Sequence, residues 1–353
     1  MAFRTIEHPN YIVEFDEPEL YMDNQARGRS GHMTHAMAEF APGCIINFNA
    51  NSSANRADGH SVYGWVEYRI SRDAGRTYEP LQTLPYAWES FLDGCCTISV
   101  EKAVACSDGS IVAICLRNSN LSAIGCEPWY TPTWIKSTDE GKTWSEPREL
   151  SPYPGRAYAA VYRDGVIYVL HYCNEWFLGQ KPEDVYRIYR SADNGESFEE
   201  VSVIPFDTAR RGYGALLFDA QGRLHAYAYN EGCETEMDHA VSEDNGQTWT
   251  VVKPCYLAKG IRNPQVALID GVYIAHGRSA DVKGFAIYTS ENGYDWDEGI
   301  YFNYWDHPIG QYYSNNINLR DEEGNFLLIQ YSESYDGSAR VNAKHVRLRV
   351  KRK

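Results

Sequence analysis

An eight-residue pattern that returns along the chain constrains the fold more than any other feature of this 353-residue sequence. It reads Ser-X-Asp-X-Gly-X-Thr/Ser-aromatic, and its copies are SRDAGRTY from Ser71, STDEGKTW from Ser137, SADNGESF from Ser191 and SEDNGQTW from Ser242. A fifth copy, SENGYDW from Ser290, is one residue shorter. The copies start 66, 54, 51 and 48 residues apart, which is a period typical of the blades of a β-propeller.

The chemistry of this pattern is that of a turn. An Asp or Asn side chain accepts hydrogen bonds from backbone N–H groups, glycine adopts a positive φ, and the hydroxyl groups tie down the two ends. The closing aromatic ring can pack between sheets. Because the same residues recur in every copy, we assign its Ser and Asp residues a structural role and no catalysis.

A second repeat predicts the number of blades. Upstream of each turn lies an apolar run, a glycine turn and another apolar run, as in AYAAVYRDGVIYVLHY. The corresponding glycines are Gly43, Gly109, Gly165, Gly222, Gly271 and Gly324. Runs such as RLHAYAY alternate with the period of two that indicates a strand. These six hairpins predict an all-β fold, a six-bladed β-propeller of four-stranded antiparallel sheets, built as a single domain over residues 1–353.

The end of the chain leaves the sixth sheet one strand short. After the last hairpin, a single strand-like run, ARVNAKHVRLRV, precedes the C-terminus. The N-terminal run from Tyr11 to Phe15 can supply the missing outer strand, and such ring closure removes an open sheet edge. We therefore expect the N-terminal strand to close the ring.

Charge and cysteine usage limit the partners. The net charge of −15 disfavours nucleic acid and anionic membrane surfaces, which both reward basic patches. No apolar stretch approaches the ~18 residues of a membrane-spanning helix, and the first residues lack the pattern of a secretory signal. The nine cysteines include no Cys-X-X-Cys pair, so we expect reduced thiols, a cytoplasmic location, and no metal or organic cofactor.

Over essentially its full length, the repeated turn and hairpin pattern resembles the sialidase (neuraminidase) superfamily of Asp-box propellers. The resemblance implies a substrate site on the propeller axis, where terminal sialic acids are hydrolysed. It also implies a Tyr nucleophile, a Glu that activates it, an Asp acid/base and three Arg residues that hold the substrate carboxylate.

Four residues take these roles through the resemblance. QYYSNNINLRDEEG places Tyr313 at the nucleophile position, and GIRNPQVALIDG places Arg262 among the carboxylate-binding arginines. Arg278, in AHGRS, is a second such candidate, and Asp58, in NSSANRADGHSVYG, is the general-acid candidate. Each has a structural alternative, namely a packed ring for Tyr313, a blade-to-blade ion pair for each Arg, and a turn for Asp58.

The starts of the inner strands are expected to form a rim around the axial site. Counting back from each repeat glycine to the start of its inner strand gives further candidate residues on this rim. The expected substrate contacts among them are His32, His35, Asp93, Arg156 and Arg211, and the same rim holds Tyr158 and Tyr213. Two His residues three apart in a strand face opposite ways, so they cannot chelate one metal together.

The chain departs from the family pattern at two places. Met33 stands where the first Arg of the family is expected, and RRGYGALLF stands where the activating Glu should open the fourth blade. Glu231 and Glu175, in nearby loops, are the candidate replacements, and we take Glu231 as the catalytic one.

Three functions remain open from the sequence. The first is a sialidase-like glycoside hydrolase that acts on a small, acidic saccharide or oligosaccharide at the axial pocket. The second is a lyase for a uronate-type saccharide, in which Tyr313 or a rim His removes a proton. The third is a propeller that binds glycans or proteins without catalysis, because the family's Glu and first Arg are missing from their places.

Overall fold

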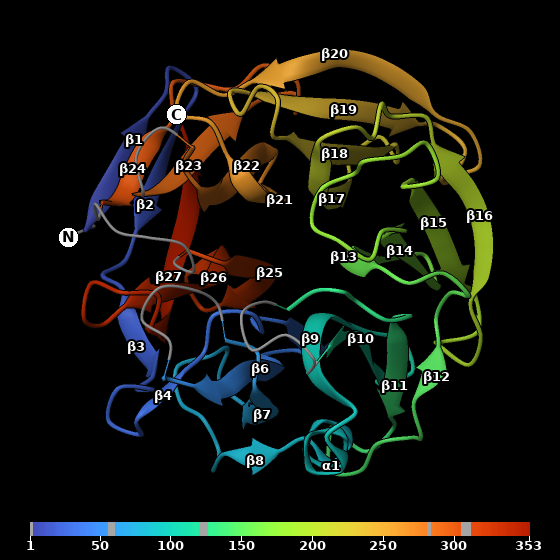
Figure 1. The fold of residues 1–353 in the computed structure, drawn as a ribbon. Coiled ribbons are helices and arrows are strands. Elements are labelled where there is room, and N and C mark those ends of the chain that lie inside the picture. The colour runs from blue at the N-terminus through green and yellow to red at the C-terminus, as the bar shows by residue number, and fades with distance from the viewer. Residues whose placement is uncertain (1–2, 56–60, 120–125, 281–283, 305–311) are drawn as a thin grey trace.

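The computed structural model describes residues 3–55, 61–119, 126–280, 284–304 and 312–353, and all ranges below refer to these. Six sheets are arranged around a common axis, and the named strands within each sheet pair antiparallel (Figure 1). The predicted six-bladed, all-β propeller is confirmed.

Each sheet begins with an innermost strand and runs outward. The first contains β5 (Met37–Ala41), β6 (Cys44–Ser53), β7 (Gly64–Ser71) and β8 (Gln82–Thr83), with β4 (Arg29–Ser30) also paired to β6. The second contains β9 (Cys96–Ala105), β10 (Ile111–Ser119), β11 (Thr133–Ser137) and β12 (Arg148–Glu149). The third contains β13 (Arg156–Arg163), β14 (Val166–Tyr172), β15 (Tyr186–Ser191) and β16 (Glu199–Ile204).

The remaining sheets follow the same order. The fourth contains β17 (Arg211–Phe218), β18 (Leu224–Asn230), β19 (Glu236–Ser242) and β20 (Thr250–Tyr256). The fifth contains β21 (Arg262–Ile269), β22 (Val272–Arg278), β23 (Gly284–Ser290) and β24 (Ile300–Tyr304). The sixth contains β25 (Ser314–Asp321), β26 (Gly324–Ser334), β27 (Val341–Arg352), β2 (Tyr11–Phe15) and β1 (Arg4–Glu7), with β3 (Glu19–Met22) also paired to β27.

The N-terminal strand β2 joins the two ends of the chain in the sixth sheet. It pairs antiparallel with β27, from Tyr11 opposite Arg352 to Phe15 opposite Leu348. Its alternate side chains Tyr11, Val13 and Phe15 are buried, and the Tyr11 hydroxyl lies 2.7 Å from Thr289 Oγ1 of β23. The closing strand is therefore held by apolar packing and by a contact with the fifth sheet.

The repeated eight-residue pattern forms the turn between the third and fourth strands of its blade. In the second blade, the Ser137 hydroxyl donates to Asp139 Oδ1 at 2.8 Å and accepts the Gly141 N–H at 2.9 Å. The Thr143 hydroxyl donates to the other oxygen of Asp139 at 2.6 Å. Gly141 has φ +84°, which disfavours a side chain there. The Ser and Asp side chains are thus engaged by the turn itself.

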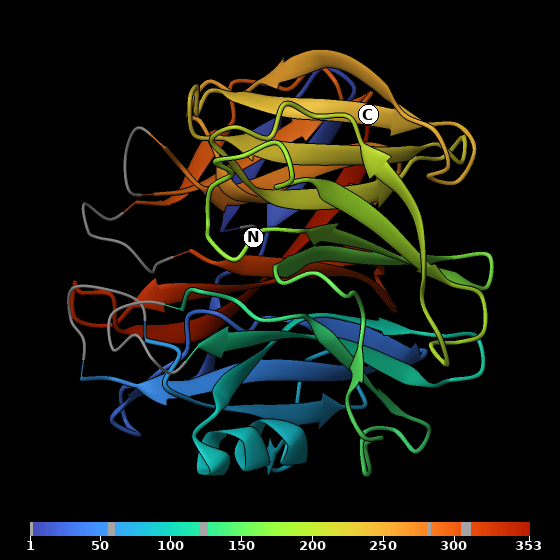
Figure 2. The same cartoon turned by 45° about the vertical axis from the view of Figure 1, so that its right-hand side comes forward.

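One helix, α1 (Pro85–Asp93), lies among the described residues, outside the ring and against β7 and β9 (Figure 2). The described part of the chain contains no helix that is long and apolar enough to cross a membrane. Successive strands of a blade run in opposite directions. The repeat turns therefore lie at one edge of the sheets, and the starts of the inner strands lie at the other edge. The site described next is at that second edge.

Candidate functional site

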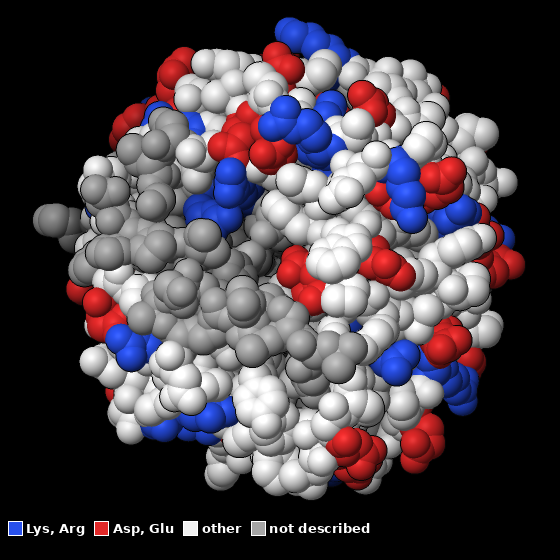
Figure 3. Space-filling view, viewed as in Figure 1, with Lys and Arg blue, Asp and Glu red and all other residues white. Residues whose placement is uncertain are grey.

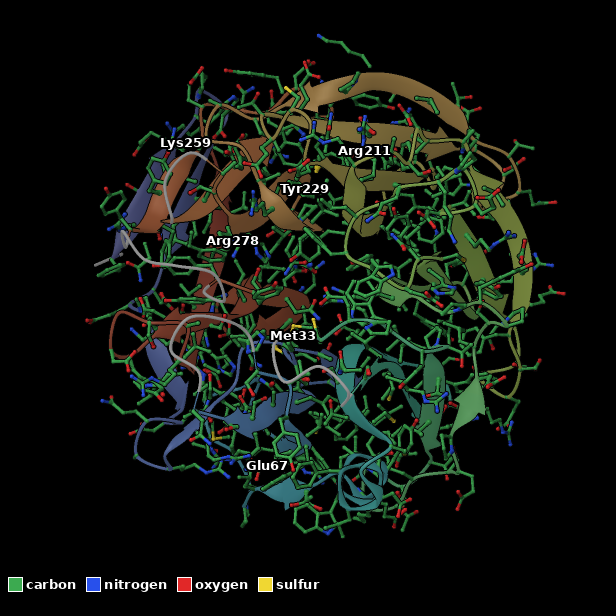
Figure 4. The ribbon with its side chains drawn as sticks, in the orientation of Figure 1. Met33, Glu67, Arg211, Tyr229, Lys259 and Arg278 are labelled. Atoms are coloured by element: carbon green, nitrogen blue, oxygen red, sulfur yellow. The ribbon has the colours of Figure 1, made fainter. Side chains whose placement is uncertain are left out.

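The starts of the inner strands bring several of the expected rim residues to one end of the axis. Arg156, Arg211 and Arg262 are the first residues of β13, β17 and β21, and Tyr313 directly precedes β25. In the space-filling view, basic and acidic side chains both border a hollow in the middle of this face (Figure 3). Figure 4 shows Arg278 and Met33 nearer the middle of the ring than Glu67 and Lys259.

Tyr313 forms the clearest link across the axis. Its ring is buried, and its hydroxyl lies 2.8 Å from the hydroxyl of Tyr213 in β17. The His32 ring packs edge-on at 5.9 Å, and the Arg278 guanidinium carbon lies 6.0 Å from the ring centre. The partner in β17 is therefore a second phenol, at the strand where the resemblance places an activating carboxylate.

The surroundings of Tyr313 favour its protonated form. Burial raises the pKa of Tyr313 well above the usual 10.0, and the neighbouring Tyr213 raises it further. The positive charges of Arg278 and Arg156 oppose this rise. In the free protein Tyr313 is thus a hydrogen-bonding phenol.

Arg156 is neutralised by a residue that the sequence analysis did not select. Its Nε and Nη2 atoms donate to Oε2 of Glu101 in β9 at 2.9 and 2.8 Å, and both side chains are buried. The guanidinium also lies 5.0 Å from the ring of Tyr158 and 5.5 Å from that of Trp129. Burial raises the pKa of Glu101, while Arg156 opposes the change. This ion pair engages the Nε and Nη2 atoms of Arg156 and balances its charge.

Arg262 and Arg211 are engaged in a similar way. Arg262 donates to Glu234, which also accepts the hydroxyl of Tyr229. Arg211 Nε donates to Asp238 Oδ2 at 2.5 Å. The Arg262–Glu234 pair is the blade-to-blade ion pair that was the structural alternative for Arg262. The Arg211–Asp238 pair lies within the fourth blade.

Arg278 differs from the other three arginines. It ends β22, is half-buried, and forms no ion pair with any carboxylate of the residues that the structure describes. Its contact with the Tyr313 ring places a positive charge beside the phenol. Among the expected carboxylate-binding residues, Arg278 has the side chain best placed to accept an anionic group.

The two rim histidines, His32 and His35, are both buried but make different contacts. His35 Nε2 donates to the backbone oxygen of His32 at 3.0 Å, and Gln330 Nε2 donates to His35 Nδ1 at 3.2 Å. Burial lowers the pKa of His35 to about 4, so its ring is neutral at neutral pH. His35 fixes the backbone that presents the His32 ring to Tyr313.

The other selected residues lie elsewhere. Asp93 is the exposed last residue of α1 on the outside of the ring, and Asp58 lies outside the described residues. Glu231 accepts the Nε–H of Arg210 at 2.6 Å on the exposed surface. Three or more His, Cys, Asp or Glu side chains do not gather anywhere in the described ranges in a way that could hold a metal ion.

Two cavities lie along the axis, on either side of Lys102. One of about 20 Å³ is bordered by Tyr313, Arg156 and Glu101, and one of about 350 Å³ lies farther along the inner strands. The Lys102 ammonium donates to Asn315 at 2.8 Å and to Gln265 at 2.5 Å, and all three residues line both cavities. Burial lowers the pKa of Lys102 to about 7, with Glu101 opposing the change.

Comparison with known proteins shows the fold. No family model and no curated protein matches the sequence. A protein of unknown function from Dyadobacter fermentans has a TM-score of 0.73 at 15% identity, with 96% of this chain and 99% of that chain covered. A mutant NanB sialidase from Streptococcus pneumoniae has a TM-score of 0.65 at 10% identity, covering 94% and 70%.

Trypanosoma rangeli sialidase is a third similar structure, with a TM-score of 0.60 at 13% identity, covering 90% of this chain and 55% of that chain. At these identities the likeness extends to the fold and no further. The chain is a six-bladed propeller with the same fold as solved sialidases.

Proposed function

We propose that this protein binds a small acidic saccharide at the axial end of the propeller and hydrolyses its glycosidic bond. The observation that carries the proposal is the half-buried guanidinium of Arg278, beside Tyr313 and without an ion pair among the described residues. A guanidinium in this state offers a planar pair of donors that matches a carboxylate. The shared fold with proteins named sialidases supports a saccharide as the ligand.

The proposal gives each residue a defined part. Arg278 binds the carboxylate, Tyr313 faces the anomeric carbon as nucleophile, and Tyr213 hydrogen-bonds to the Tyr313 hydroxyl. Asp58 protonates the leaving oxygen as the glycosidic bond breaks, and water takes the Tyr313 proton as Tyr313 bonds to the anomeric carbon. A second water then displaces Tyr313, which regains a proton, and gives a proton back to Asp58. Because Arg210 engages Glu231, we do not assign Glu231 the activation of Tyr313. Arg262, Arg211 and Arg156 shape the site through their ion pairs.

A second function is favoured by one observation, the phenol pair itself. Burial and Tyr213 both raise the pKa of Tyr313, and a phenol that keeps its proton is a poor nucleophile. In a propeller that only binds glycans, the same hydroxyl would donate a hydrogen bond to the ligand. The raised pKa also weighs against a lyase in which Tyr313 acts as the base.

A panel of aryl glycosides of sialic, uronic and neutral sugars distinguishes these functions. We expect the wild type to turn over an acidic member, Tyr313→Phe to lose that turnover, and Tyr256→Phe, at an exposed position of β20, to keep it. An unsaturated product that absorbs in the ultraviolet would indicate a lyase instead. Saturable binding without turnover would indicate the binding function, and turnover untouched by Tyr313→Phe would overturn the proposal.

A further inference from the structure

The small axial cavity holds two buried polar atoms without a partner. Oε1 of Glu101 and the hydroxyl of Tyr158 make no hydrogen bond with any described residue, and each atom is shielded from solvent. Glu101 and Tyr158 are 9% and 3% exposed, and both line the cavity. Buried polar atoms in folded proteins are almost always hydrogen-bonded, so these two atoms indicate a missing partner.

The arrangement of Glu101 leaves this oxygen available. Both hydrogen bonds from Arg156 to Glu101, one from Nε and one from Nη2, go to the other oxygen, Oε2, at 2.9 and 2.8 Å. The ion pair therefore holds the carboxylate in place while Oε1 keeps its full capacity to accept. Tyr158, whose ring packs against the Arg156 guanidinium at 5.0 Å, supplies a hydroxyl that can donate or accept.

The cavity sets the size of the missing partner. Its volume of about 20 Å³ accommodates a single water molecule or one hydroxyl group. A second carboxylate would be repelled by Glu101, whereas a water or an alcohol can donate to Oε1 and accept from Tyr158 at once.

We propose that Glu101 and Tyr158 form a hydroxyl-binding subsite at the base of the axial site. It holds one water molecule in the free protein and takes a hydroxyl group of the bound saccharide in its place. The second half of this statement rests on the proposed function. Because Tyr313 lines the same cavity, a hydroxyl bound there lies next to the reacting group, and Arg278 also lies close to the Tyr313 ring.

Crystal structures of the free protein test the subsite without any need for activity. In the wild type we expect one ordered water at about 2.7–3.2 Å from both Glu101 Oε1 and the Tyr158 hydroxyl. In Tyr158→Phe, which removes only the hydroxyl, we expect that water to be lost or shifted. An empty cavity in the wild type, or a direct hydrogen bond between Glu101 and Tyr158, would overturn the subsite.

Kinetics with the saccharide found in the panel test the second half. We expect Glu101→Gln and Tyr158→Phe each to lower kcat/KM by about 10- to 100-fold. The wild type should have a lower kcat/KM for a deoxy substrate that lacks the bound hydroxyl than for the full saccharide, and this difference should disappear in both variants. Unchanged kinetics in Tyr158→Phe, alongside loss of turnover in Tyr313→Phe, would reject the hydroxyl role and leave the proposed function intact. Turnover unaffected by Tyr313→Phe would reject both the hydroxyl role and the proposed function. The crystallographic water would then still test whether Glu101 and Tyr158 form the subsite in the free protein.

Discussion

The hydroxyl groups of Tyr213 and Tyr313 lie 2.8 Å apart, although 100 residues separate them in the chain. One belongs to the fourth blade and the other to the sixth, so their contact crosses the axis of the propeller. Glu101 and Arg156 join the neighbouring second and third blades. The Tyr213–Tyr313 contact therefore joins two blades that are not consecutive in the chain.

This contact should be measurable as a coupling free energy. We expect Tyr213→Phe and Tyr313→Phe to be coupled by about 1 kcal/mol in a double-mutant cycle on unfolding by urea, because each removes one end of a buried hydrogen bond. The pair Tyr213→Phe and Tyr256→Phe, whose second position is exposed on β20, serves as the control. Coupling in the control as large as in the test pair would contradict the assigned contact.

Ring closure by β2 should contribute strongly to stability. Phe15 is fully buried between sheets, so Phe15→Ala should lower the free energy of unfolding by about 3–5 kcal/mol. Phe3, which is 47% exposed, gives the matched control, because its replacement by Ala removes much less buried surface. Equal losses for the two variants, measured by chemical denaturation, would argue against closure through this strand.

The repeat turns should make stability depend on acid pH. The Thr143 and Thr248 hydroxyl bonds are the largest cause that lowers the pKa of Asp139 and Asp244 from 3.8 to about 2. The unfolded chain therefore takes up these protons first, so the stabilisation is full above about pH 4 and is lost as the pH falls toward about 2.

Replacing Asp139 and Asp244 by Asn should flatten this dependence. Urea unfolding at a series of pH values between about 5 and 2 measures it, with Glu89→Gln, at an exposed position of α1, as the control. A slope in the double Asn variant that equals the wild-type slope would show that the turns do not set the acid response.

The cysteines should fall into two classes of reactivity. All nine are free thiols, but only Cys95 and Cys233 are exposed. Burial raises the pKa of Cys126, Cys173 and Cys255 to about 12, which keeps them as unreactive thiols. A thiol reagent should thus label two sites quickly in the native protein and nine after denaturation. Fewer than nine in the denatured protein would contradict the free-thiol state.

The blade count could be predicted because its signals are local. Gly165 and Gly222 each sit in a two-strand hairpin with positive φ, and Asp139 bonds within four residues of itself. The function of the axial residues could not be predicted in the same way. Whether an arginine is free or paired depends on whether a carboxylate from another segment reaches it. Glu234, which is 28 residues from Arg262 in the chain, pairs with Arg262 in this way.

Glu101 shows what the sequence analysis missed. It stands beside Lys102 in the otherwise uncharged run TISVEKAVA, and two adjacent charges in an inner strand are a signal of a polar axis. The sequence contains no such signal that Tyr213, which it places on the rim, is the hydrogen-bonding partner of Tyr313. Only the closed ring brings the two rings together.

The most direct test of the central claim compares a saccharide with a carboxylate to its carboxamide analogue. If Arg278 binds the carboxylate, the wild type should prefer the acid by at least about tenfold in kcat/KM, and Arg278→Gln should reduce that preference to near unity. Arg262→Gln, which breaks the pair with Glu234, is the matched control and should keep the preference. A preference that survives in Arg278→Gln, or that disappears in Arg262→Gln alone, would contradict the account.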